Sequence, residues 1–172
     1  MSFFEWVWRI LKENYTFLLQ GIGFTMLMAL VGTFIGFAIG LGVAIVRTIP
    51  TEENSSKIKK ILLGAIKAIF TAYIEIFRGT PMIVQSVVIY YGLQGAGVAI
   101  DPLVAAILII SVNTGAYMAE IIRGGIISVD NGQTEGAHSI GMTHWQTMTK
   151  VVLPQAIRNI MPSVGNEFVV NI

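Results

Sequence analysis

An apolar run without any charged residue covers residues 17–46, and it limits what this chain can fold into more than any other feature. About 20 consecutive apolar residues suffice for a helix to cross the roughly 30 Å hydrocarbon core of a bilayer. The composition agrees, since 54% of the residues are hydrophobic and only 12% are charged. Soluble domains usually carry about twice that charged fraction. The sequence therefore predicts an all-α membrane protein.

Several chemistries are disfavoured by composition. The net charge of +1 provides no strong field that would attract nucleic acid. The absence of cysteine excludes a disulfide framework, a thiolate metal site and a cysteine nucleophile. His138 and His144 lie six positions apart, and no third ligand is spaced to join them. We therefore expect no catalytic residues, no metal site and no cofactor within this chain.

The remaining apolar segments extend this plan. Residues 1–16 predict an interfacial helix, with Trp6, Trp8 and Tyr15 at the level of the lipid headgroups. Residues 17–172 are expected to form the transmembrane domain, with spans over 17–46, 81–99 and 102–122 and a partial span over 156–172. Within the first span, Gly32, Gly36 and Gly40 recur on one helix face, a pattern typical of close helix packing.

Residues 58–78 have a different pattern. Their apolar residues follow the i, i+3, i+4, i+7 spacing, while lysines and other polar residues occupy the remaining faces. This arrangement is typical of a helix on the membrane surface or against protein, so we interpret it as interfacial.

The distribution of basic residues predicts the orientation in the membrane. With residues 58–78 interfacial, nine of the 11 basic residues fall on one side: Arg47, Lys57, Lys59, Lys60, Lys67, Arg78, Arg123, Lys150 and Arg158. Cytoplasmic loops carry an excess of Lys and Arg. The N-terminus is thus expected outside, and residues 128–154 are expected in the cytoplasm.

That cytoplasmic segment contains clear helix signals. Asp130 suits the start of a helix, and Gly141 suits the left-handed position at its end. "THWQ" is a capping box formed by Thr143 and Gln146. A second short helix is expected to carry Trp145, Met148 and Val152 on one side, until Pro154 stops or kinks it. Local chemistry thus predicts a helix, a glycine elbow and a helix, which serve either as a docking element or as a plain connection.

The stretch "EGAHSIGMTHWQTMTKVVLP" (residues 135–154) resembles the EAA motif of ABC importer permeases. The matching positions are Glu135, Gly136, Ala137, Gly141, Val151, Leu153 and Pro154, with Gly136 in place of the middle alanine and Val151 in place of isoleucine. "YIEIFRGTPMIVQ" (73–85), "NTGAYMAEIIRGGI" (113–126), "GQTEGA" (132–137) and "LPQAIRNIMPSVGNEF" (153–168) resemble the polar amino-acid branch of that superfamily. The resemblance covers most of the chain.

The resemblance implies a type I importer permease with a MetI-like helical bundle in a bacterial inner or plasma membrane. Two permease subunits would form the path, an extracellular binding protein would deliver a polar amino acid, and separate ATPase subunits would hold ATP and Mg²⁺. The segment that seats in the ATPase would comprise Glu135, Gly136, Ala137, His138, Ser139, Gly141 and Met142. No Walker A pattern occurs in this chain. Such permeases continue through further spans, so we expect a C-terminally truncated form.

Polar residues within the spans are candidates for the substrate path. Asn113, Tyr117 and Glu120 share one helix face, and Asn166 and Glu167 follow Pro162 and Gly165, in a place where transporters interrupt helices near the midplane. Gln85 is a further candidate. For Glu120 the structural alternative is an ion pair with Arg123 or Arg78.

Functions other than transport fit the sequence less well. A membrane-embedded serine or aspartyl protease needs His, Ser or paired Asp residues inside spans, whereas His138, His144, Asp101 and Asp130 all lie outside them. A channel or scaffold would not explain the EAA-like segment. The sequence leaves open which amino acid is carried (glutamine, glutamate, a basic amino acid or cystine), whether the permease dimer is homomeric, and whether the binding protein is fused.

Overall fold

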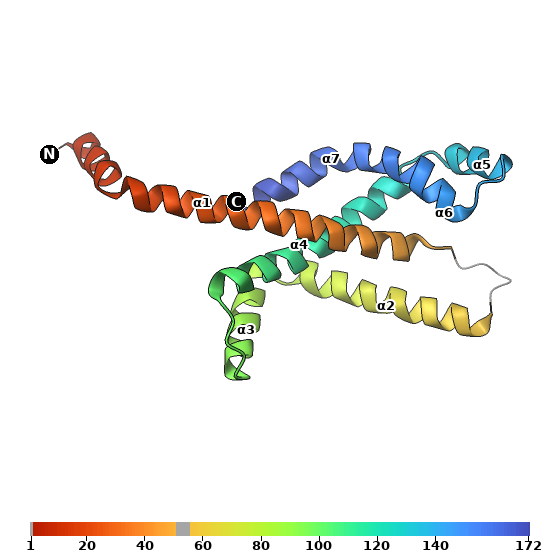
Figure 1. Ribbon diagram of the computed structural model, residues 1–172, viewed down its shortest axis with the longest axis horizontal. Coiled ribbons are helices and arrows are strands. Elements are labelled where there is room, and N and C mark those ends of the chain that lie inside the picture. Colours follow the sequence, from red (N-terminus) through yellow and green to blue (C-terminus); the bar gives the residue numbers. More distant parts are fainter. Residues whose placement is uncertain (1, 51–55) are drawn as a thin grey trace.

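The computed structural model describes residues 2–50 and 56–172, and its regular elements are helices (Figure 1). Residues 51–55 of the polar loop expected after the first span lie outside the described residues. The elements are α1 (Phe3–Thr48), α2 (Lys57–Gly79), α3 (Met82–Gly95), α4 (Pro102–Ile127), α5 (Asn131–Ser139), α6 (His144–Thr147), the π-helical turn η1 (Met148–Val152) and α7 (Leu153–Val170). The all-α fold expected from the sequence is confirmed.

The core forms where α1 crosses α4. Gly32, Gly36 and Gly40 of α1 are buried there. A methyl group added to Gly36 would lie 2.7 Å from Thr114 Cγ2, and one added to Gly40 would lie 2.5 Å from Met118 Cβ. The two backbones approach so closely only because these positions lack side chains. The close packing expected from the glycine spacing is confirmed.

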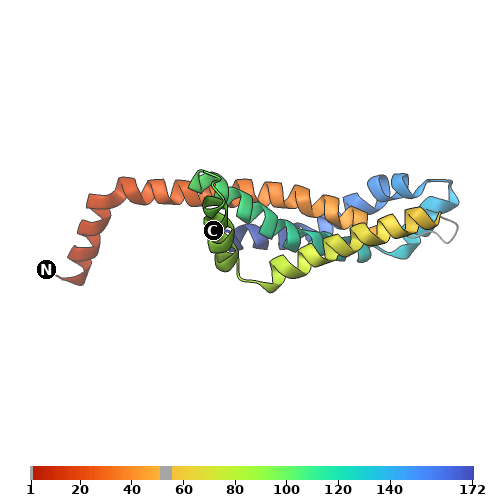
Figure 2. The ribbon, with the colours of Figure 1, turned by 90° about the horizontal axis from the view of Figure 1, so that it is seen from below.

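The N-terminal part of the chain is helical and continuous with the first expected span. Residues 1–16 were expected to form an interfacial helix; α1 runs from Phe3 to Thr48 without a boundary at residue 16 and bends near its N-terminal end (Figures 1 and 2), and the interfacial position stays a prediction. Residues 2–24 are all exposed, including Trp6, Trp8 and Tyr15. No other described element covers this part of α1.

Helix α2 lies alongside α1 in both ribbon views rather than across it (Figures 1 and 2). Its buried Ile74 packs with Tyr73 and Phe77 in a second cluster that includes Ala116 and Ala119 of α4. The Tyr73 hydroxyl donates to the carbonyl oxygen of Val112 at 2.5 Å. Contact with protein, one of the two settings that the pattern suggested, accounts for the apolar stripe, and the interfacial position of residues 58–78 stays a prediction.

Helix α3 is shorter than the span expected over residues 81–99. It has 14 residues, which at 1.5 Å per residue give about 21 Å. It projects from the side of the bundle (Figure 1), and a turn with Gly97 at φ +80° follows it. Within the described residues, only α1 and α4 are long and apolar enough to cross a membrane.

The segment at residues 128–154 folds as a helix, a glycine turn and a second helix. Beyond the glycine turn, however, α6 runs through η1 into α7 without a stop at Pro154. Proline lacks the N–H that an α-helix needs. Directly before Pro154, Leu153 N–H donates to Met148 O five residues back, which is the bond of a π-helical turn. Trp145 is 61% exposed while Met148 and Val152 are buried, so the three side chains do not share one side as expected. Helix α7 likewise continues through Pro162 rather than breaking there.

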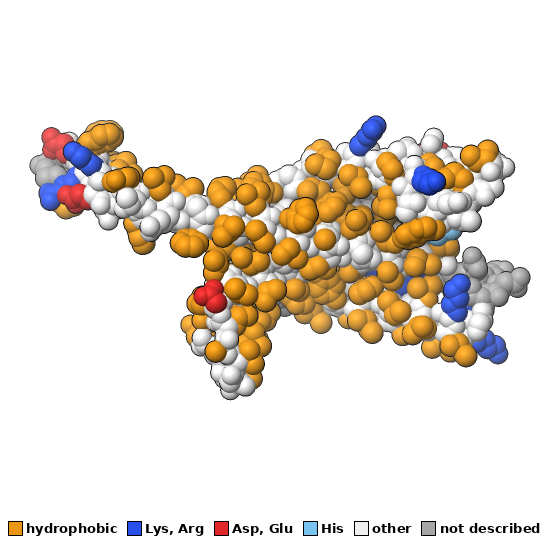
Figure 3. All heavy atoms as spheres, viewed as in Figure 1, with side chains coloured by type: hydrophobic (Ala, Val, Ile, Leu, Met, Phe, Trp, Pro, Cys, Tyr) orange, Lys and Arg blue, Asp and Glu red, His pale blue; other side chains and the backbone are white. Residues whose placement is uncertain are grey.

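Hydrophobic side chains cover most of the visible face of the bundle, and Lys and Arg side chains gather mainly toward its two ends (Figure 3). One basic group lies over the start of α2, at the end of the bundle that also holds α5 and α6 (Figures 1 and 3).

Candidate functional site

A cavity of about 400 Å³ opens where the break between α2 and α3 meets α4 and α7. Its lining is polar for an otherwise apolar bundle and comprises Thr80, Pro81, Met82, Asn113, Tyr117, Asn166, Glu167, Val170 and Asn171. Four of the six residues expected along a substrate path therefore surround one space: Asn113, Tyr117, Asn166 and Glu167. Gln85 lies behind this wall, and Glu120 is elsewhere.

Two side-chain amides hold the break between α2 and α3 (residues 79–81). This break is called the elbow from here on and is distinct from the glycine turn at Gly141. The Gln85 amide nitrogen donates to the carbonyl oxygens of Phe77 at 3.0 Å and Thr80 at 2.9 Å. Asn113 of α4 donates to Gln85 Oε1 at 2.9 Å and to Phe77 O at 3.2 Å. Carbonyls at a helix end lack partners within the helix. The side-chain amides of Gln85 and Asn113 donate hydrogen bonds to these free carbonyl oxygens in place of water. They thereby fix the backbone that forms the wall of the cavity.

Glu167 contributes a carboxylate to the cavity. Glu167 is 8% exposed, and within the described residues its side-chain carboxylate makes no hydrogen bond and no ion pair at contact distance. Arg78, far away in the sequence but close in space, attracts this carboxylate electrostatically from the end of α2. Its guanidinium carbon lies 5.3 Å from the centre of the Tyr117 ring. A carboxylate inside a membrane bundle is costly unless it faces a partner or a cavity. Glu167 meets that condition through the cavity.

Asn171, which also lines the cavity, makes polar contacts that were not expected from the sequence. Asn171 Nδ2 donates to Thr33 Oγ1 at 2.9 Å and to Thr114 Oγ1 at 3.0 Å. These bonds join α1, α4 and the end of α7. The available signal was the presence of two threonines inside apolar helices, but their meeting depends on where α1 crosses α4.

Glu120 occupies a different place from Asn113 and Tyr117. It pairs with Arg123 on its own helix at 3.0 Å and with Arg47 at the end of α1. The structural alternative of a pair with Arg123 is thus confirmed, and the pair with Arg78 is wrong. Arg47 was missed because it lies 73 positions away and only the α1–α4 crossing brings it close.

The residues expected to contact an ATPase are displayed at one end of the bundle. Asp130 caps α5 by accepting from Gly132 N–H at 2.7 Å. Within α5, Glu135, Gly136, His138 and Ser139 are exposed while Ala137 is buried against the protein. We call residues 135–142 the coupling segment.

The turn of the coupling segment is locally fixed. Gly141 adopts φ +83°, a conformation that other residues rarely adopt, and Met142 N–H donates to Ala137 O at 3.1 Å. Thr143 and Gln146 form the expected capping box, with bonds of 2.9 and 3.3 Å. The predicted helix, glycine elbow and helix are confirmed as structure.

The sequence family described as "Binding-protein-dependent transport system inner membrane component" matches residues 61–172. This chain belongs to that family. The matched part includes the elbow, the cavity and the coupling segment.

Individual relatives of this chain are permease proteins of ABC transport systems. The probable amino-acid ABC transporter permease protein YckA of Bacillus subtilis (strain 168) is 36% identical over 158 residues, which cover 92% of this chain and 65% of the relative. The L-cystine transport system permease protein TcyB of the same strain is 34% identical, with 94% of this chain and 64% of the relative covered. The glutamine transport system permease protein GlnP of Escherichia coli (strain K12) is 33% identical, covering 96% and 71%. The chain thus spans about two thirds of the length of these relatives.

Solved structures show the same fold. A crystal structure of an amino acid ABC transporter with histidines is 38% identical and has a TM-score of 0.79; the match covers 99% of this chain and 72% of that chain. An inward-facing form of the MetNI methionine ABC transporter is 25% identical and has a TM-score of 0.73; the match covers 92% of this chain and 71% of that chain. The MetI-like bundle expected from the sequence is confirmed.

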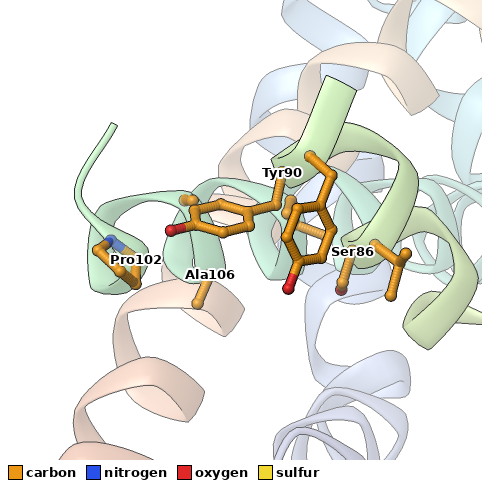
Figure 4. Close-up of a pocket in the computed structure, with 8 residues that line it drawn as sticks. Ser86, Tyr90, Pro102 and Ala106 are labelled. Carbon is orange, nitrogen blue, oxygen red and sulfur yellow. The ribbon is translucent and has the colours of Figure 1, made fainter. Parts of the chain in front are cut away.

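The chain has a further cavity of about 260 Å³ between α3 and α4 (Figure 4). Ser86, Tyr90, Pro102 and Ala106 are among its lining residues, and its wall is largely apolar. Asp101, beside it, accepts from the backbone N–H groups of Leu103 and Val104 at the start of α4. Asp101 and Asp130 therefore act as helix caps, one before and one after α4.

Proposed function

We propose that this chain is a permease subunit of an ABC importer that takes up a polar amino acid of the glutamine, glutamate, basic or cystine class. It would act by alternating access, driven by a separate ATPase subunit that holds ATP and Mg²⁺. A second permease subunit and an extracellular binding protein would complete the importer. Family membership supports the permease role, and the named substrates of the relatives support the amino-acid class.

The observation that carries the proposal is the coupling segment. It projects from one end of the bundle, exposes its polar side chains and is built on a glycine turn. A rigid protrusion of this kind can transmit movement of a bound partner to the helices behind it. In the proposed orientation the N-terminus lies outside the inner membrane and the coupling segment lies in the cytoplasm, where an ATPase binds.

The proposed substrate path runs through the 400 Å³ cavity. An amino acid in this cavity would meet the aromatic face of Tyr117, the amide of Asn166 and the carboxylate of Glu167. Asn113 forms part of the cavity wall. Gln85 supports this wall from behind through the elbow. Glu120 takes the role of holding α1 and α4 together rather than contacting substrate.

Two glycine variants test the coupling role. Gly141→Val forces a β-branched side chain into φ +83°, and Gly97→Val does the same at φ +80° in the turn between α3 and α4. Neither added Cβ meets another atom within 4 Å, so both variants impose backbone strain alone. The second variant is thus a matched control at a site away from the coupling segment.

The complete importer, reconstituted in liposomes, is assayed for substrate-stimulated ATP hydrolysis and for uptake. We expect Gly141→Val and Glu135→Lys to lose uptake and substrate stimulation, with Gly97→Val retaining both. Normal uptake in both coupling-segment variants would refute the docking role. Absence of uptake of every polar amino acid by the unmodified importer would refute the substrate class.

A further inference from the structure

A separate cavity of about 420 Å³ lies where the ends of α1 and α4 meet α5 and η1. Its polar lining residues are Arg47, Thr48, Arg123, Asn131 and Thr134, and it also has an apolar wall. No Asp or Glu lines it. It is distinct from the 400 Å³ cavity, with which it shares no lining residue.

Among the residues that the structure describes, positive charge exceeds negative charge at this cavity. Arg47 and Arg123 both pair with the single carboxylate of Glu120, which leaves one positive charge in excess. Arg123 uses Nε and Nη2 in this pair, and Arg47 uses Nη1. Each guanidinium has five N–H donors in a planar fork. Within the described residues, no hydrogen bond engages Nη1 of Arg123 or Nη2 and Nε of Arg47.

The remaining donors are reachable. The side chain of Arg123 is 37% exposed and that of Arg47 is 19% exposed. Two guanidinium groups at the rim of one cavity suit phosphate oxygens, because the arginine fork binds phosphate in a bidentate manner. Thr48, Asn131 and Thr134 add polar groups around the same space.

We infer that this cavity binds a phosphate-bearing anion, with the phosphodiester headgroup of an anionic lipid as its source. The apolar wall, which includes Ile126 and Ile127, favours a lipid over a free ion because it can receive the glycerol and upper acyl region. Basic pockets between membrane helices on the cytoplasmic side bind anionic headgroups in other proteins. The cytoplasmic position rests on the proposed function, whereas the cavity and its charge do not.

A lipid in this place would contact α1 and α4 through the two arginines and α5 through Asn131 and Thr134. It would therefore join the bundle to the helix that carries the coupling segment. The inferred role is that an anionic lipid stabilises the coupling segment against the bundle.

The test measures lipid binding to the purified permease–ATPase complex by native mass spectrometry, with phosphatidylglycerol and phosphatidylcholine as probes. Arg123→Gln removes one guanidinium while Glu120 keeps its pair with Arg47. Thr134→Phe fills the cavity without changing any charge. Arg158→Gln, at an exposed position of α7, removes the same charge elsewhere.

We expect the unmodified complex to prefer phosphatidylglycerol. Arg123→Gln should weaken that binding roughly tenfold or more, because one charge-assisted contact is lost. Thr134→Phe should weaken it by a similar factor, because the added ring occupies the space of the headgroup. Arg158→Gln should leave it unchanged. Thr134→Phe keeps the test decisive if Arg123→Gln fails to fold, because it leaves the ion pairs intact.

A second arm titrates inorganic phosphate. Binding of phosphate that depends on Arg123, without such binding of phosphatidylglycerol, would support the anion site and overturn its lipid source. Equal binding of phosphatidylglycerol by all four proteins, with no Arg123-dependent phosphate binding, would overturn the site. Uptake is measured separately on the unmodified importer, so a failure of transport with intact lipid binding overturns the proposed function alone.

Discussion

Substitution of Gly40 by alanine should loosen the crossing of α1 and α4. The added methyl group would lie 2.5 Å from Met118 Cβ, 2.7 Å from Ala119 N and 2.8 Å from Met118 C. Comfortable contacts between heavy atoms are about 3.5–4.0 Å, and two of these three atoms belong to the backbone and cannot rotate away. The helices must therefore move apart by about 1 Å, at a cost of about 1–3 kcal/mol for overpacking. Alanine returns up to about 1 kcal/mol through helix propensity, so we expect a net loss of about 1–2 kcal/mol.

Gly42→Ala provides the control on the same helix. Gly42 is exposed, and a methyl group there meets no atom within 4 Å. The unfolding free energy of the Gly42→Ala variant should be unchanged or higher than that of the unmodified protein, by up to about 1 kcal/mol. Both variants are unfolded in detergent micelles by titration with dodecyl sulfate, followed by circular dichroism. If Gly40→Ala is as stable as Gly42→Ala, the proposed contact between the two backbones is wrong.

Three further substitutions test the polar contacts by the same unfolding measurement. Asn113→Ala removes two donated bonds at the elbow and should cost about 1–3 kcal/mol; an unchanged free energy would mean that Gln85 holds the elbow alone. Glu120→Gln should cost a similar amount, because two guanidinium groups lose their shared carboxylate, and a cycle with Arg47→Gln should show positive coupling. Asn171→Ala should cost about 0.6 kcal/mol for each interhelical bond lost, and a stability gain would contradict the contact.

Features that depend on neighbouring residues followed from the sequence. The capping box at Thr143 and Gln146, the cap at Asp130 and the left-handed Gly141 each need only a few adjacent positions. The glycine spacing of α1 also predicted a packing face, because it places small residues on one side of a helix regardless of the partner. Local rules therefore sufficed for the coupling segment and for one half of the α1–α4 interface.

Features that depend on helix crossings did not follow. The sequence grouped Glu120 with Asn113 by helical spacing, but Arg47 arrives from α1 and determines its pairing. Gln85 and Asn113 were expected along the substrate path, and nothing in the sequence indicated that their amides also bind carbonyl oxygens at the end of α2. Proline rules predicted breaks at Pro154 and Pro162, yet the π-helical turn and the surrounding packing let the helix continue.

The continuity of α6, η1 and α7 has a mechanical consequence. From His144 to Val170 the backbone is helical throughout, so no slack loop separates the coupling segment from Glu167 in the wall of the 400 Å³ cavity. On the other side, residues 128–130 connect α4 to α5 without a helix. The coupling segment is therefore joined to α7 by continuous helix and to α4 by a short non-helical connection. A force applied at Gly141 would rotate α6, η1 and α7 about residues 128–130 and displace α7 at the cavity. Helix α4 would stay in place, because it packs closely against the glycines of α1.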